Sequence, residues 1–90
     1  MRFEWDGKKA IANLRKHDVS CEEASSTFYD PLSATGDDPD HSGSDRRFVT
    51  FGVSSSRRLL VVAHTEEHDT IRIISARKAT RAERRLYEEG

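Results

Sequence analysis

The clearest pattern of hydrophobic and polar positions lies in the second half of the chain. Apolar and polar residues alternate from Arg46 to Val53, and two further apolar runs follow at Leu59–Thr65 and Thr70–Ala76. Alternation with a period of two is typical of β-strands, and short polar segments at 54–56 and 66–69 separate the runs. The pattern therefore predicts three strands joined by turns as an antiparallel meander.

The first half of the chain predicts a short edge strand followed by a helix. Arg2–Trp5 can form the strand, and Asp6 is a typical N-cap because its carboxylate accepts hydrogen bonds from the first free amides of a helix. This helix is expected to begin at Gly7 and to end near His17 and Asp18. Its spacing predicts a buried stripe formed by Ala10, Ile11 and Leu14.

Capping residues predict where two further helices begin. Two pairs have the spacing of a capping box, in which a hydroxyl and a carboxylate satisfy free amides, namely Ser20 with Glu23 and Thr80 with Glu83. The helix that begins after Ser20 is expected to end near Phe28, and the helix that begins after Thr80 is expected to run through Tyr87. Residues 31–45, rich in Ser, Gly, Asp and Pro, are predicted to form one long acidic loop.

The order of these elements predicts the fold class. It reads β-α-α-β-β-β-α, with two helices grouped before the main sheet, which favours an α+β fold over a parallel α/β sheet. A chain of 90 residues has the size of one domain with a small core, so residues 1–90 are expected to form a single domain.

Charge is distributed unevenly along the chain. The formal net charge is -1, yet residues 1–45 hold five Lys/Arg against ten Asp/Glu, whereas residues 46–90 hold ten against six. A basic C-terminal half suits a phosphate-rich partner. Cys21 is the single cysteine, so an internal disulfide is excluded. Without a long apolar run or a hydrophobic N-terminal signal, the expectation is a cytoplasmic protein with no membrane partner.

Two blocks of residues carry a resemblance to a known family. The opening block Phe3–Asp6, with Lys9, Asn13, Lys16–Val19 and Glu22–Ala24, resembles the start of the BrnT toxin family, and Arg72–Arg77, with Ala79-Thr80, Glu83-Arg84 and Tyr87, resembles its end. Asp30-Pro31, Arg47-Phe48, Gly52 and Leu60–Val62 lie between them at matching intervals. Two departures are Cys21, where an aromatic is frequent, and the absence of a glycine in Ser54–Arg57.

The resemblance implies both a fold and a function. It implies a RelE-like α+β fold, with two N-terminal helices packed on a twisted antiparallel sheet that a C-terminal helix completes. It also implies a metal-independent, cofactor-free endoribonuclease toxin of a bacterial type II toxin–antitoxin pair, which inhibits translation by cleaving RNA. A BrnA-like DNA-binding antitoxin would neutralise this toxin, and the two would repress their operon together, so that DNA is contacted only through the antitoxin.

Cleavage of RNA by its own 2′-hydroxyl requires a proton acceptor, a cation for the phosphorane and a proton donor. Arg77 is the first choice for holding phosphate, because a guanidinium offers planar paired donors; the alternative is a solvated surface arginine. His64 is a candidate for proton transfer because imidazole titrates near neutrality; the alternative is a packed or merely exposed histidine. Glu83 is a second candidate base, with the capping box as its alternative role. Tyr87 could stack a base or donate a hydrogen bond; the alternative is a core tyrosine that anchors the helix.

Further basic residues are candidates for binding RNA or a partner. The predicted RNA-binding set is Arg46, Arg47, Lys9, Lys16 and Lys78, and Asn13 shares a helix face with two of them. The helix dipole is an alternative reason for Lys16. The predicted partner-binding set is Arg72, Arg81, Arg84 and Arg85, which an acidic or amphipathic antitoxin segment would cover. In a regular strand Arg72 and Arg77 would lie on opposite faces.

Other functions are weaker interpretations of the same residues. A non-enzymatic module that binds the antitoxin and helps it to repress DNA remains the main alternative. A helix-turn-helix is disfavoured because Glu22 and Glu23 would repel phosphate. The His64-to-His68 spacing suits a metal only on a helix, and this segment is predicted as a strand, so no metal site is expected. The same two glutamates disfavour a thiolate at Cys21.

Overall fold

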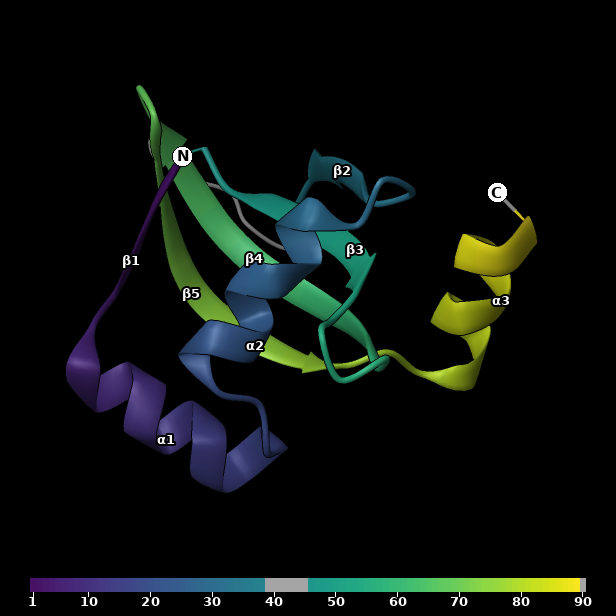
Figure 1. Cartoon of the computed structure of the whole chain (residues 1–90), viewed down its shortest axis with the longest axis horizontal. Helices are drawn as coiled ribbons and strands as arrows, with labels where there is room; N and C mark the ends of the chain where they lie inside the picture. Colours follow the sequence, from purple (N-terminus) through teal and green to yellow (C-terminus); the bar gives the residue numbers. More distant parts are fainter. Residues whose placement is uncertain (39–45, 90) are drawn as a thin grey trace.

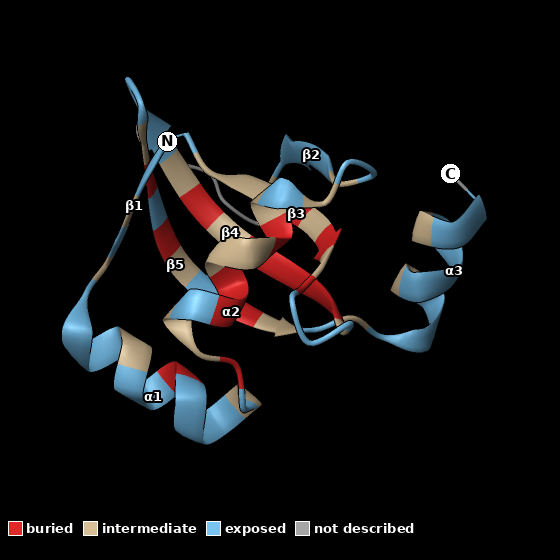
Figure 2. Cartoon of the chain, in the orientation of Figure 1, coloured by how far each residue is buried: buried red, intermediate tan, exposed pale blue. Residues whose placement is uncertain are grey.

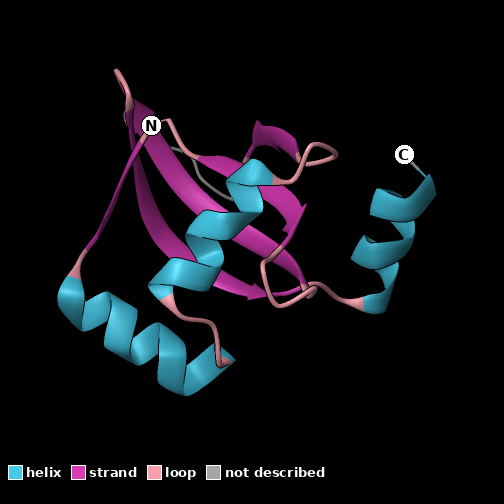
Figure 3. Ribbon diagram, viewed as in Figure 1, coloured by secondary structure: helices cyan, strands magenta, loops and turns pink. Residues whose placement is uncertain are grey.

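The structure is a computed structural model and describes residues 1–38 and 46–89. Its elements are β1 (Arg2–Trp5), α1 (Gly7–His17), α2 (Cys21–Ser26), the 3-10 turn η1 (Thr27–Tyr29), β2 (Ala34–Asp37), β3 (Phe48–Val53), β4 (Leu59–Glu67), β5 (Thr70–Lys78) and α3 (Arg81–Glu89). The fold is therefore α+β, as the order of elements predicts. Figure 3 shows α2 in front of the sheet, α1 below it, and α3 standing apart.

The described strands form one sheet in the order β1-β5-β4-β3-β2. The three strands of the predicted meander are confirmed, and each pairs antiparallel with its neighbour. The sheet is nevertheless mixed, because β1 lies parallel to β5 with Arg2 opposite Thr70 and Trp5 opposite Ile73. The expectation of a wholly antiparallel sheet is thus wrong. The direction of a pairing between chain segments so far apart depends on the tertiary path, not on the local pattern.

The segment predicted as one acidic loop contains a strand. Ala34–Asp37 forms β2 and pairs antiparallel with β3, with Ala34 opposite Phe51 and Asp37 opposite Phe48. All four residues are exposed, as suits a short edge strand, so no alternation of buried and exposed positions marks it in the sequence. Residues 39–45 of the predicted loop lie outside the described part of the chain.

The core lies between the sheet and the two N-terminal helices. Figure 2 shows the buried positions concentrated on β4, β5 and α2. The cluster consists of Val19, Ala24, Leu60, Val62, Ile71, Ile73 and Ala76, with Phe3, Trp5 and Phe28 packed against it. In Figure 1, α2 crosses this face of the sheet and α3 lies beyond the end of β5. The opposite face of the sheet carries neither α1 nor α2.

Glycine at position 52 allows the 3-10 turn to approach β3. A Cβ atom there would lie 2.7 Å from the carbonyl oxygen of Thr27 and 3.1 Å from its Cβ. Those distances are shorter than van der Waals contact, so a side chain would push η1 away from the sheet.

The predicted helix starts are confirmed by their caps. The Asp6 carboxylate accepts from the amides of Lys8 and Lys9 at 3.0 and 3.1 Å. The Ser20 hydroxyl accepts from the amide of Glu23 at 3.1 Å. At the far end of α1, Asp18 has a φ of 59° and donates its amide to the Leu14 carbonyl, which ends the helix with a left-handed residue.

The buried stripe predicted for α1 is wrong. Ile11 and Leu14 are 58% and 48% exposed, whereas Asn13 is 7% exposed. The amide nitrogen of Asn13 donates to the carbonyls of Val19 and Ala76 at 3.2 and 2.9 Å, and its oxygen accepts from the Ala76 amide at 3.1 Å. Because a buried amide requires all these partners, Asn13 decides which side of α1 faces the sheet.

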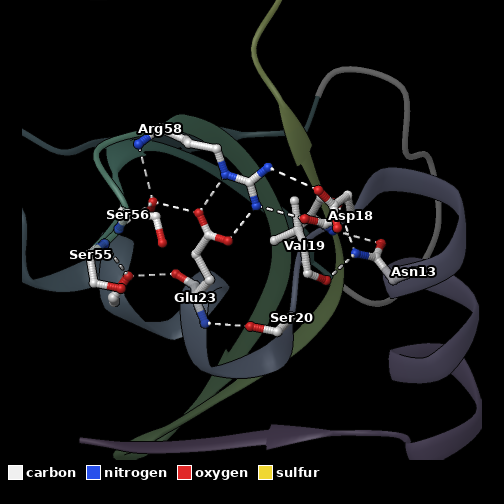
Figure 4. A network of polar contacts seen from close by, with 11 residues as sticks. Asn13, Asp18, Val19, Ser20, Glu23, Ser55, Ser56 and Arg58 are labelled. Carbon is white, nitrogen blue, oxygen red and sulfur yellow. Dashed lines mark hydrogen bonds and ion pairs between the residues drawn. The ribbon is translucent and has the colours of Figure 1, made fainter.

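A second polar network holds α2 to the β3–β4 turn. Glu23 is buried, and its Oε2 accepts from Arg58 Nε at 2.8 Å and from Ser54 Oγ at 2.7 Å. Arg58 Nη2 also donates to Glu23 Oε1 and to the Asp18 carbonyl. Figure 4 shows Arg58 between Glu23 and Asp18. The predicted capping glutamate of α2 therefore serves this network, while Ser20 caps the helix.

None of the described helices is long and apolar enough to span a membrane.

Candidate functional site

An extra residue in β5 changes which side chains reach the open face of the sheet. Ala63 pairs with Ser75, whereas the next residue of β4, His64, pairs with Ile73, so Ile74 has no opposite residue. An insertion of this kind is a β-bulge, and it shifts the alternation of side chains along the bulged strand by one position. Before Ile74 the odd-numbered residues of β5 face the core, and after it the even-numbered residues do.

The bulge brings Arg72 and Arg77 onto the same face. Arg72 pairs with Thr65 and Arg77 with Val61, and these two residues of β4 are four positions apart on a strand without an insertion. Val62 between them faces the core cluster, so both arginines lie on the face away from α1 and α2. The prediction that strand parity separates Arg72 from Arg77 is wrong, because it assumed a regular strand.

A hollow of about 380 Å³ lies on this open face. Its floor is apolar and is formed by side chains of β3 and β4, and Arg77 and Glu83 lie at its rim. Gly36, Asp37 and Asp38 border it from β2 and the following residue; the floor residues are Val49, Phe51, Val61 and Ala63, with Ser75 beside them. The hollow thus joins an apolar surface to a cationic group.

Arg77 and Glu83 form a bidentate ion pair. Nη1 donates to Oε1 at 2.8 Å and Nη2 to Oε2 at 2.9 Å, and the Arg77 side chain remains 42% exposed. Glu83 Oε1 also accepts from the Thr80 amide at 2.8 Å, and Thr80 Oγ1 accepts from the Glu83 amide at 3.2 Å, which confirms the predicted capping box. The bonds from Arg77 lower the pKa of Glu83 to about 2. This carboxylate is ionised at neutral pH and is a weak base.

Tyr87 shares a helix face with Glu83 and connects α3 to the body of the protein. Its hydroxyl donates to Asp30 Oδ2 at 2.6 Å, and the same oxygen accepts from the Val53 amide at 2.8 Å. The hydrogen bond to this carboxylate raises the pKa of Tyr87 to about 12, so the phenol keeps its proton at neutral pH. Asp30 is a site residue that the sequence reasoning missed, although it belongs to the Asp30-Pro31 pair of the family pattern.

His64 lies on the other side of the sheet. It is fully buried, its Nε2 lies 2.7 Å from Thr50 Oγ1, and its ring packs edge-on to Phe28 with centroids 4.9 Å apart. Its Nδ1 is 3.8 Å from Glu66 Oε1, beyond hydrogen-bond distance. Burial lowers the pKa of His64 to about 4. The structure therefore places this predicted proton-transfer group in the core and does not bring it to Arg77.

A second hollow, of about 500 Å³, brings together four of the predicted binding residues. Lys9, Arg46, Arg47 and Arg72 line it, along with Thr65, Glu66, Glu67 and Ile74. Arg46 also pairs with Asp37 at 3.1 Å and lies over the Phe48 ring at 5.2 Å, and Arg72 Nη1 is 3.6 Å from Glu4 Oε1. Because Arg72 and Arg77 share one face, the two hollows lie on the same side of the sheet.

Other predicted residues lie elsewhere. Lys16 is exposed on the last turn of α1 and lines neither hollow. Lys78 pairs with the buried Leu60 and acts electrostatically on Glu23, so it belongs to the helix-covered side. Asn13 is committed to the core by its bonds to Ala76. The remaining set, Arg81, Arg84 and Arg85, is exposed on α3.

In the described part of the chain, no group of three or more His, Cys, Asp or Glu side chains is arranged to hold a metal ion. The His64-to-His68 spacing, which would suit a metal only on a helix, falls on β4 and the turn after it; His64 is buried and His68 is exposed.

The fold and this face together define a small α+β protein whose open sheet surface carries clustered arginines. The family model described as "Ribonuclease toxin, BrnT, of type II toxin-antitoxin system" matches residues 5–83, and the chain belongs to this family. A comparison with curated proteins finds no significant match.

A solved structure with the same fold is the ribonuclease toxin BrnT of Brucella abortus, determined by crystallography at 1.1 Å resolution. The two chains are 23% identical and superimpose with a TM-score of 0.66, over 90% of this chain and 99% of the other. At this identity the similarity concerns the fold.

Proposed function

We propose that this chain is an endoribonuclease toxin that cleaves RNA without a metal ion, and that the open face of its RelE-like sheet binds the RNA. The observation that carries the proposal is the bulge at Ile74, because it places Arg77 on the same face as Arg72 and the cluster around it. Membership of a ribonuclease toxin family supports the reaction class. Clustered cations on one surface are what a polyphosphate requires.

In this proposal Arg77 stabilises the phosphorane that forms when the 2′-hydroxyl attacks. Its side chain is partly exposed at the rim of the first hollow, where its remaining N–H donors can reach a phosphate. Glu83 acts as a positioning residue: it holds the guanidinium plane through two bonds, and its low pKa makes it a poor proton acceptor. Tyr87 keeps α3, and therefore Glu83, in place through Asp30.

The second hollow would bind neighbouring phosphates of the same RNA. Lys9, Arg46, Arg47 and Arg72 supply cations there, while the apolar floor of the first hollow offers Phe51 as a surface for a base. His64 has a structural role in this scheme, because its ring is enclosed between Phe28 and Phe48.

We also propose that a BrnA-like antitoxin neutralises the toxin in the cytoplasm and that the two repress their operon together. The exposed arginines of α3, with Arg72, would form part of the contact, because an acidic partner segment there would exclude RNA electrostatically. The partner-binding set is then Arg72, Arg81, Arg84 and Arg85. DNA would be bound by the antitoxin alone.

The test is digestion of a long RNA by the purified chain in the presence of EDTA, comparing wild type with Arg77→Ala. The matched control is Arg15→Ala, an exposed arginine on α1, outside both hollows. Loss of a donor that stabilises the transition state is expected to reduce cleavage by about 100-fold or more, with the control unchanged. Cleavage that stops with EDTA, or that persists in Arg77→Ala, would contradict the proposal.

A second candidate is a non-enzymatic module that grips the antitoxin and assists repression. The observation in its favour is that both terminal nitrogens of Arg77 are already occupied by Glu83. This candidate predicts that RNA remains intact while addition of the chain tightens operator binding by the antitoxin.

A further inference from the structure

The exposed apolar side chains of α1 form a surface that the described structure does not cover. Ile11 and Leu14 are three residues apart and lie on neighbouring positions of one helix face. They are 58% and 48% exposed, although apolar residues at this spacing usually form the buried face of an amphipathic helix. The sheet is contacted instead through Asn13, so the apolar stripe of α1 points away from the core.

The same face of α1 is strongly basic. Lys8 and Arg15 lie three residues before and four residues after Ile11, so both lie beside it, on the edge of the stripe away from Leu14. The helix contains Lys8, Lys9, Arg15 and Lys16 and no Asp or Glu. Among the ion pairs found within residues 1–38 and 46–89, none contains Lys8 or Arg15. An apolar stripe with cations along one edge is the complement of an acidic amphipathic segment.

We infer that this face of α1 is a docking surface for an acidic amphipathic helix of a protein partner, which would lay apolar side chains on Ile11 and Leu14 and carboxylates beside Lys8 and Arg15. Helices bind helical or groove surfaces through apolar residues at three- and four-residue spacing. The inference rests on the proposed function only for the identity of that partner, the antitoxin. In Figure 1, α1 and α3 lie on opposite sides of the molecule, so this surface is separate from the arginines of α3.

Other occupants fit the same surface less well. A second copy of the chain would bring two helices with four cations each into contact, which like-charge repulsion opposes. RNA would use the cations and would not require the apolar stripe. A membrane surface would need a larger apolar face than Ile11 and Leu14 provide on an 11-residue helix.

The probe is a synthetic peptide of about four helical turns, with Leu on one face at helical spacing and Glu on both flanks. One control peptide replaces the Glu residues by Lys, and another replaces the Leu residues by Ser. The whole chain is titrated with each peptide while the NMR amide signals of the protein are followed. The Glu/Leu peptide is expected to bind and to shift signals within Lys8–Arg15, and both control peptides are expected to fail.

Two variants test the surface itself. Ile11→Ser with Leu14→Ser removes the stripe, and Leu32→Ser, at a residue 74% exposed elsewhere, is the matched control. The double variant is expected to bind the Glu/Leu peptide at least about tenfold more weakly than wild type. The control variant is expected to bind it like wild type. If the double variant fails to fold, Lys8→Glu with Arg15→Glu tests the same surface through its charges and is expected to give the same loss.

Four outcomes would overturn the inference: no binding of the Glu/Leu peptide, binding that shifts signals elsewhere, binding unchanged by these variants, or equal binding of the Lys/Leu peptide. If light scattering shows that wild type is a dimer and the double variant is a monomer, the occupant of this surface is a second copy of the chain. Sedimentation with anionic phosphatidylserine vesicles that depends on Ile11 and Leu14 would replace it by a membrane. None of these measurements uses RNA, so their failure leaves the ribonuclease proposal standing, and inactivity toward RNA leaves the docking surface standing.

Discussion

Arg77 holds Glu83 through two parallel hydrogen bonds, Nη1 to Oε1 at 2.8 Å and Nη2 to Oε2 at 2.9 Å. The guanidinium belongs to the end of β5 and the carboxylate to the first turn of α3, so the pair fixes the helix against the sheet. Glu83 caps the same helix through Thr80. One carboxylate therefore caps the start of α3 and also orients the arginine that we propose binds phosphate.

Removing the charge of Glu83 is expected to reduce both stability and its dependence on pH. Glu83→Gln should lower the free energy of unfolding by about 0.5–1 kcal/mol, a modest value because Arg77 is partly exposed to solvent. The pKa of Glu83 is about 2 in the folded protein and 4.5 ordinarily. Its contribution is thus complete above the ordinary pKa and is lost as the pH falls toward 2.

Urea unfolding at several acidic pH values, compared with neutral pH, measures this effect. Wild type should lose more stability than Glu83→Gln across that window, so that the two proteins converge in acid. The control is Glu88→Gln, an exposed residue of the same helix. Parallel pH curves for wild type and Glu83→Gln would contradict the assignment.

Loss of the Tyr87 hydroxyl is expected to release α3. Tyr87→Phe removes the bond to Asp30 and should cost about 1 kcal/mol, with faster hydrogen exchange confined to residues 81–89. None of the residues of α3 is buried, so few other contacts compensate. Tyr29→Phe is the control, because Tyr29 is 67% exposed. Unchanged exchange in α3 would show that this bond does not hold the helix.

The hydrogen bond between Tyr87 and Asp30 can also be tested by following the ionisation of Tyr87 in an ultraviolet titration. The pKa of Tyr87 is raised to about 12 by its bond to Asp30, and Asp30→Asn should return it toward the ordinary value of 10. The stabilisation from this bond is present below the ordinary pKa and is lost as the pH rises toward 12. A Tyr87 titration that is the same in Asp30→Asn would contradict the coupling.

Adjacent glutamates of α2 are expected to differ sharply. Glu23→Ala removes the carboxylate that accepts from Arg58 and Ser54 and should destabilise the fold by about 2 kcal/mol, since Arg58 then keeps only its contacts with Asp18. Glu22→Ala, one residue earlier and exposed, should change stability by less than about 0.5 kcal/mol. Chemical unfolding of both variants makes the comparison, and similar losses would refute the role given to Glu23.

Burial of neutral His64 predicts a loss of stability in weak acid. Its pKa is about 4 in the folded protein and 6.5 ordinarily, so the unfolded chain binds the proton first. Stability should therefore fall as the pH drops from 6.5 to 4, by up to about 3 kcal/mol. His64→Gln should remove this dependence, whereas His68→Asn, at an exposed histidine, should keep it. An NMR titration that gives His64 a pKa near 6.5 would contradict its burial.

Local sequence signals were sufficient to predict most of the helices and strands. The capping residues Asp6, Ser20 and Thr80 mark helix starts that the structure confirms, because a cap acts on amides within three residues of itself. Alternation and turns predicted strands at 46–53, 59–65 and 70–76, and the structure has them at 48–53, 59–67 and 70–78. Arg77 and Glu83 were both named as candidates, although their direct pairing was not predicted.

The errors share one physical origin, which is that they concern contacts between distant parts of the chain. The stripe of Ile11 and Leu14 was predicted to be buried by periodicity, but Asn13 satisfies the backbone of Ala76 and turns the helix. His64 was predicted to face a cleft because it lies near the end of a strand. Segments packed over this side of the sheet, including Phe28, bury it instead. Asp30 was missed because its partner Tyr87 lies 57 residues away.

The sequence by itself determined the α+β class, the helix starts, the three-stranded meander and the concentration of cations in its second half, since these depend on neighbouring residues. The tertiary structure decided the parallel pairing of β1, the strand at 34–37 and the bulge at Ile74. Because a single inserted residue reverses the face of every side chain after it, only the pairing of β4 with β5 could place Arg72 and Arg77 on one surface.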